Sequence, residues 1–99
     1  MNCIRTDNDV ESRLAIEGAL DALSAPEIRP IFDKVVTDKR RRVTLDLQSV
    51  TMIDSSGVGA IVSLFKRIKA EGGQVSVVNA HDQPLAVLKL LKLDKVLGL

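Results

Sequence analysis

The chain has 99 residues, of which 45% are hydrophobic, and a formal net charge of +1. This length predicts a single domain, residues 1–99, that buries roughly 65% of the surface exposed by the unfolded chain. Nucleic-acid binding relies on basic surfaces and aromatic stacking, whereas this chain is nearly neutral and has only two aromatic residues, Phe32 and Phe65. We therefore expect a small globular domain without a nucleic-acid partner.

The cysteine count and the N-terminal residues indicate the compartment. The single Cys3 cannot form a disulfide within the chain, and the first dozen residues are too polar for the apolar region of a signal peptide. No apolar run approaches the ~20 residues that a membrane-spanning helix requires. We expect a cytoplasmic protein that does not insert into a membrane.

The first twenty residues predict a β-hairpin. Asn2–Thr6 forms a short edge strand, and the turn formers Asp7-Asn8-Asp9 fold the chain back. The returning strand covers about Arg13–Glu17, because apolar and polar side chains alternate there. The segment Gly18-Ala19-Leu20-Asp21 is then expected to leave the sheet.

A helix is predicted after the hairpin. Ser24 to Glu27 fits a capping box, with serine at the N-cap and Pro26 inside the first turn. Pro30 has no amide hydrogen, so we expect it to distort the first turn or to delay the regular start of the helix. The apolar residues that follow recur at helical spacing and define one buried stripe: Ile28, Ile31, Phe32, Val35 and Val36.

The basic run Lys39–Arg42 joins this helix to a strand. The favoured interpretation is a solvated loop near a helix C-terminus, where cations are stabilised, and the alternative is contact with an acidic partner. The strand Val43–Leu47 follows, with Asp46 pointing away from its apolar residues.

A second helix begins near Val58 and is followed by a strand. The glycines Gly72-Gly73 end this helix, since glycine tolerates the left-handed backbone of a helix C-terminus. Gln74–Val78 is rich in β-branched residues and predicts a strand. The buried stripe of the helix consists of Val58, Ile61, Val62, Phe65 and Ile68.

A third helix and a last strand complete the predicted fold. Asp82 is expected to cap this helix, with Pro84 in its first turn, and Lys95–Leu97 is interpreted as a short final strand. The apolar face of the helix is Leu85, Val87, Leu88 and Leu91. The element order contains two strand–helix–strand units after a hairpin, so we predict an α/β fold with a mixed sheet.

Residues Thr51–Gly59 carry the main functional signal. An acid, two hydroxyls and two glycines lie between a strand pattern and a helix pattern, where free backbone N–H groups at the helix start favour negative charge. One interpretation is that Asp54, Ser55 or Ser56 simply caps the helix. The sharper hypothesis is that one serine becomes phosphorylated, which adds about −1.5 to −2 charges beside Asp54 and repels a partner that docks there.

Three other chemistries have weaker support in these residues. A serine enzyme requires a base, and the only histidine, His81, is better interpreted as solvated or locally hydrogen-bonded. Metal-ligand spacings are missing. Gly57-Val58-Gly59 is a fragment of a phosphate loop without its lysine, so nucleotide binding remains a minor hypothesis. We expect no cofactor and no metal.

The segment Val43 to Gly73, above all Asp54-Ser55-Ser56-Gly57-Val58-Gly59, resembles the STAS domain of bacterial anti-sigma-factor antagonists. Gly18-Ala19-Leu20-Asp21 resembles the family's turn after its second strand. The resemblance implies a mixed sheet of four or five strands with helices mainly on one face. It also implies partner switching: the unmodified protein binds an anti-sigma factor that is a serine kinase, the kinase inactivates it by phosphorylation, and a manganese- or magnesium-dependent phosphatase restores it.

The resemblance also implies roles for single residues. Ser56, the second serine of the pair, corresponds to the phosphate acceptor, and Asp21 to the acidic residue beside the site. Asp54 is expected to cap or orient rather than to catalyse, and the protein is not an enzyme. The remaining residues of the partner-binding surface are Ser55, Gly57, Val58 and Gly59. The alternative function is an unphosphorylated scaffold subunit of a transporter or lipid-transport complex.

Overall fold

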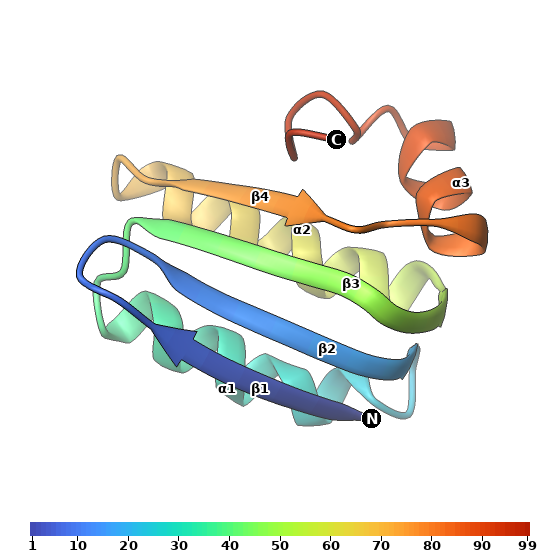
Figure 1. Ribbon diagram of the computed structural model, residues 1–99, viewed down its shortest axis with the longest axis horizontal. Coiled ribbons are helices and arrows are strands. Elements are labelled where there is room, and N and C mark those ends of the chain that lie inside the picture. Colours follow the sequence, from blue (N-terminus) through green and yellow to red (C-terminus); the bar gives the residue numbers. More distant parts are fainter.

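The computed structural model describes residues 1–99 as a four-stranded sheet with three helices (Figure 1). The elements are β1 (Asn2–Asp7), β2 (Ser12–Leu20), α1 (Ala25–Thr37), β3 (Arg42–Ile53), α2 (Ser55–Ala70), β4 (Gln74–Val78) and α3 (Asp82–Leu90). The strand order is β1-β2-β3-β4; β1 is antiparallel to β2, and the other two pairs are parallel. The predicted mixed sheet and α/β class are confirmed.

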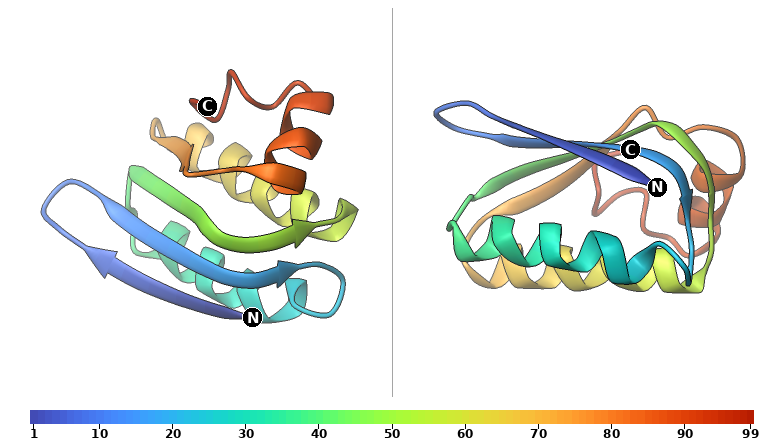
Figure 2. Two further views of the ribbon diagram at one scale, coloured as in Figure 1. Left: turned by 45° about the vertical axis from the view of Figure 1, so that its right-hand side comes forward. Right: turned by 90° about the horizontal axis from the view of Figure 1, so that it is seen from below.

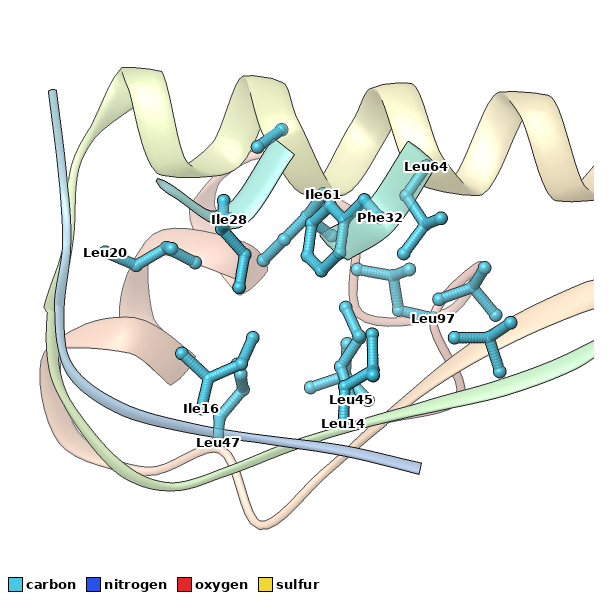
Figure 3. Close-up of a cluster of buried hydrophobic side chains, with 14 of the residues drawn as sticks. Leu14, Ile16, Leu20, Ile28, Phe32, Leu45, Leu47, Ile61, Leu64 and Leu97 are labelled. Atoms are coloured by element: carbon cyan, nitrogen blue, oxygen red, sulfur yellow. The ribbon is translucent and has the colours of Figure 1, made fainter. Parts of the chain in front are cut away.

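Helices α1 and α2 lie side by side on one face of the sheet, and α3 lies beside the ends of β3 and β4 (Figures 1 and 2). The core fills the space between sheet and helices and is aliphatic except for Phe32 (Figure 3). The two predicted helical stripes face this core, with Ile31, Val36, Val62 and Phe65 partly buried at its margin. In α3 only Leu88 of the predicted apolar leucines is fully buried, whereas Leu91 is about half exposed.

Strands β2 and β3 are longer than their sequence pattern indicates. They stay paired as far as Leu20 and Ile53, so the chain leaves the sheet at Asp21 and not at Gly18. The register shifts at two points along β2, one of them next to Gly18, whose φ is +93°. These irregularities break the alternation of apolar and polar residues, which explains why the pattern ended early.

The predicted capping box at the start of α1 is wrong. Ser24 occupies the N-cap position, but its hydroxyl donates to the Ala19 carbonyl (2.8 Å) and accepts from the Asp21 N–H (2.9 Å) instead of bonding the helix. The expected delay at Pro30 is also wrong, because α1 is helical from Ala25 onward with Pro30 inside it.

Two predictions near the C-terminus are corrected as well. Asp82 is not the cap of α3: His81 holds the N-cap position, and Asp82 is the first helical residue. Residues 95–97 form a turn rather than a strand. This segment still touches the sheet edge, because the Leu97 carbonyl accepts a hydrogen bond from the Val77 N–H (2.7 Å) and the Leu97 side chain is buried.

The basic loop Lys39–Arg42 lies at the end of the sheet opposite the Asp54 turn (Figure 1). Arg40 is structural: its guanidinium donates to the Ser12 hydroxyl and to the Glu11 carbonyl, both at 2.8 Å. Lys39 and Arg41 are exposed, as expected for a solvated loop, and so is Arg42, the first residue of β3.

Candidate functional site

Asp54 links the start of α2 to the loop between β2 and α1. It holds the N-cap position, where one carboxylate oxygen accepts from the Ser56 N–H (2.9 Å) and the Gly57 N–H (3.1 Å). The other oxygen accepts from the Ala22 N–H (3.2 Å). The capping role predicted for Asp54 is therefore confirmed, and the same carboxylate also fixes a loop more than thirty positions earlier in the chain.

Asp21 organises that second loop from within. Its carboxylate accepts hydrogen bonds from the N–H groups of Leu23 and Ser24, each at 3.0 Å, in an arrangement typical of Asx turns. The Ala25 N–H donates to the Asp21 carbonyl (2.8 Å) and starts α1. As a result, the Leu23 side chain projects outward and is 88% exposed.

Gly57 allows the two loops to come together. The Asp54 N–H donates to the Leu20 carbonyl (3.2 Å), so the end of β2 lies against the first turn of α2. A Cβ on residue 57 would lie 2.2 Å from the Leu20 carbonyl oxygen and 2.9 Å from Ile53 Cγ1. Gly59 differs, because a Cβ there would meet only the Arg29 guanidinium at 3.9 Å. Val58 is buried, so its side chain belongs to the core rather than to the surface.

The serine pair lies within the helix. We expected the helix to begin near Val58, but the Asp54 cap starts it at Ser55, and the Val58 N–H already donates to the Asp54 carbonyl (2.9 Å). Ser55 is exposed and Ser56 is half-buried. The Ser56 N–H donates to the Asp54 carboxylate, while the hydroxyls of both serines have no hydrogen-bond partner elsewhere in the chain.

Gln83 of α3 also supports this turn, and no sequence pattern indicated that role. Strand β3 continues beyond the end of β4, which leaves its edge without a neighbouring strand. The Gln83 amide replaces that neighbour by accepting from the Ile53 N–H and donating to the Ile53 carbonyl, both at 2.8 Å. No spacing in the sequence connects Gln83 to Ile53, so only the fold shows this contact.

His81 is held in place and does not serve the serines. Its ring nitrogens contact the Asp82 carboxylate (2.5 Å) and the Gln48 carbonyl (2.7 Å), in agreement with the predicted local hydrogen bonding. The bond to Asp82, helped by the Gln48 carbonyl, raises the pKa of His81. With both nitrogens engaged, His81 is not placed to activate Ser55 or Ser56.

The structure contains neither a metal-binding cluster nor a helix that could span a membrane. No three side chains of the His, Cys, Asp or Glu type are gathered in the way that a metal site requires. None of the helices has the length and apolar composition needed to cross a bilayer. The arrangement is a surface of two loops joined by hydrogen bonds, with two unpaired hydroxyls at a helix start.

Substitution of Asp54 with alanine is expected to lower the free energy of unfolding by about 1–2 kcal/mol, because the N-cap and the loop contact at Ala22 are lost together. Urea denaturation measures this difference. Asp54→Asn keeps an acceptor oxygen for the cap and should cost only about half as much. Equal stability of the alanine variant and the wild type would contradict the role assigned to Asp54.

Comparison with known proteins identifies the family of the chain. The model of the STAS domain family matches residues 4–99. An anti-sigma-B factor antagonist of Bacillus subtilis is 26% identical over 97 residues, which span 96% of this chain and 84% of that protein.

Solved structures show the same fold. The crystal structure of a putative anti-sigma factor antagonist from Thermotoga maritima superposes with a TM-score of 0.89 at 26% identity, covering 96% of this chain and 82% of that one. The Bacillus cell fate determinant SpoIIAA in its phosphorylated form superposes with a TM-score of 0.79 at 16% identity, covering 96% and 87% of the two chains. With nearly every residue matched by the family model, the chain belongs to the STAS domain family.

Proposed function

We propose that this protein is an anti-sigma-factor antagonist, a regulatory binding protein and not an enzyme, that is switched off by phosphorylation of Ser56. Its partner is an anti-sigma factor with serine kinase activity. The observation that carries the proposal is the pair of unpaired serine hydroxyls in the first turn of α2, on a surface that Asp54 joins to the β2–α1 loop. Relatives named as anti-sigma factor antagonists support the choice of partner.

In the modification, the γ-phosphoryl group of ATP forms a bond to the Ser56 hydroxyl oxygen. The bond between the β and γ phosphates breaks, ADP leaves, and the hydroxyl proton passes to a base of the kinase. A phosphatase that depends on manganese or magnesium reverses the change by hydrolysis. These steps place the protein in the cytoplasm, where ATP and sigma factors are found.

Phosphorylation at this position is compatible with the native fold. The phosphate sits at the positive end of the α2 dipole, which stabilises negative charge by about 0.3–1 kcal/mol. The Asp54 carboxylate accepts from the backbone N–H groups of Ser56 and Gly57, so the cap does not depend on the serine hydroxyl. The new charge therefore acts on a docked partner and leaves the domain folded. SpoIIAA, which shares this fold, has been solved in a phosphorylated form.

The docking surface consists of the exposed parts of both loops. Ala22 and Leu23 come from the β2–α1 loop, and Ser55 and Gly59 come from the outer side of α2. Asp21 and Asp54 lie between them, and their carboxylates hold the loops by accepting hydrogen bonds from backbone N–H groups. A partner that covers this surface would remove Leu23 from water, and buried anchors of this kind dominate protein interfaces.

Leu23→Ser is expected to weaken binding of the cognate kinase about tenfold or more, because the exposed leucine is the main apolar anchor of the docking surface. Leu90→Ser is the matched control, since Leu90 is also a highly exposed leucine (80%) but lies on α3. Both changes should leave stability within about 0.5 kcal/mol. Equal affinities of the two variants, measured by calorimetry, would argue against this docking surface.

The alternative function, a scaffold subunit of a transporter or lipid-transport complex, uses the same surface without phosphorylation. Purification of the tagged protein from its own cells distinguishes the two. The proposal predicts that a protein with ATP-dependent serine kinase activity copurifies. Copurification of a membrane permease without such a kinase would favour the scaffold.

A further inference from the structure

Arg29 of α1 reaches across to the first turns of α2. Its terminal guanidinium nitrogen lies 3.9 Å from the position that a Cβ of Gly59 would occupy. Arg29 is exposed and takes part in no ion pair or side-chain hydrogen bond of the structure. The acid one turn further along α1, Asp33, is already paired with Arg67 of α2. An unpaired cation is therefore held beside the N-terminal part of α2.

Ser56 lies on the flank of α2 that faces α1, the helix that carries Arg29. Residues of an α-helix are spaced by about 100°, so Ser56, Ser63 and Arg67 fall within about 40° of one another around α2. Since Arg67 pairs with Asp33, this stripe faces α1. Ser55 points about 100° away from Ser56, toward solvent, and is the more exposed of the two serines.

The distances allow direct contact after modification. Residues three apart on a helix have Cβ atoms about 5–6 Å apart, so Ser56 and the position of a Cβ on Gly59 are neighbours. A guanidinium that already touches the Gly59 position needs only a change of side-chain rotamer to meet a phosphate on Ser56. Arginine binds phosphate through two parallel N–H bonds, which makes such a pair stronger than one with lysine.

We propose that Arg29 is the internal charge partner of phosphorylated Ser56 and that it holds the phosphate against the α1 side of α2. This inference rests on the proposed function for the modification itself. Pairing fixes the phosphate in one position on the modified protein.

The test uses the full chain with phosphoserine installed at position 56 during synthesis, so that no kinase is needed. Phosphorus NMR follows the second pKa of the phosphate as the pH is changed. A nearby cation stabilises the dianion and lowers this pKa, so Arg29→Gln is expected to raise it by about 0.3–0.7 units. Arg29→Lys should give a smaller rise, because lysine cannot form the paired N–H bonds.

Arg41→Gln is the matched control, since it removes the same charge from an exposed arginine at the opposite end of the sheet. It should leave the phosphate pKa unchanged. No shift with Arg29→Gln, or the same shift with Arg41→Gln, would overturn the pairing. An equal Arg29 effect on phosphoserine at position 55 would overturn the assignment to Ser56. Failure of the kinase to modify Ser56 would refute the proposed function. The NMR titration would still test the pairing, because its phosphoserine is installed without the kinase.

Discussion

Gly57→Ala is expected to lower the free energy of unfolding by about 3 kcal/mol, at the upper end of the usual cost of overpacking. The added methyl group would lie 2.2 Å from the Leu20 carbonyl oxygen, and its other close neighbours are the side chains of Leu20 and Ile53. A carbonyl of a paired strand cannot move away as a flexible side chain can, so α2 or the end of β2 must shift. A loss of this size is a large part of the stability of a typical small domain.

Gly59→Ala is the control for this change, because it adds the same methyl group two residues later in the same helix. The space at Gly59 is open, and alanine favours a helix by about 1 kcal/mol over glycine. This variant should therefore be as stable as the wild type or up to about 1 kcal/mol more stable. Urea denaturation gives both values. A Gly57→Ala variant that unfolds at the same urea concentration as the wild type would contradict the close approach of β2 and α2.

Ser56→Asp is expected to weaken binding of the cognate kinase by about 30-fold or more, whereas Ser56→Ala should bind within about threefold of the wild type. Aspartate places a charge on the docking surface, and an unpaired charge buried at an interface costs about 2–5 kcal/mol. Alanine removes only a hydroxyl that has no partner within the chain. Calorimetry with the purified kinase and ADP gives the affinities.

The stability of the Ser56 variants shows whether binding is lost at the docking surface alone or because the domain unfolds. An acid in the first turn of a helix is compatible with the helix dipole, so Ser56→Asp should unfold at the same urea concentration as the wild type, or at a higher one. A folded Ser56→Asp protein that binds as well as Ser56→Ala would contradict switching by charge.

The helices and strands could be predicted because their apolar residues are periodic. The stripes on α1 and α2 required only spacing, whereas the polar residues before α2 left Asp54, Ser55 and Ser56 as alternative caps until the structure showed Asp54 in that position. The ends of β2 and β3 could not be predicted in the same way. Bulges near Gly18 shift the register there, and the polar residues Gln48 and Ser49 look like a loop although they belong to a paired strand.

The contacts that shape the candidate site join residues far apart in the chain, and no local sequence pattern indicates them. Ala22 meets Asp54, and Gln83 meets Ile53, across about thirty residues in each case. The misassigned capping box has the same origin: Ser24 matched the motif, but the Ala19 carbonyl was available inside the loop and took its hydroxyl. A hydrogen bond within the folded loop therefore replaced the helix cap that the local motif predicted.

The assignment of Ser56 as the phosphate acceptor can be tested directly. The wild type, Ser55→Ala and Ser56→Ala are incubated with the cognate kinase and ATP, and the modified residue is mapped by mass spectrometry. We expect phosphate on Ser56 in the wild type and in Ser55→Ala, and none in Ser56→Ala. Phosphate on Ser55 or on any other residue of the wild type, or continued modification of Ser56→Ala, would contradict it.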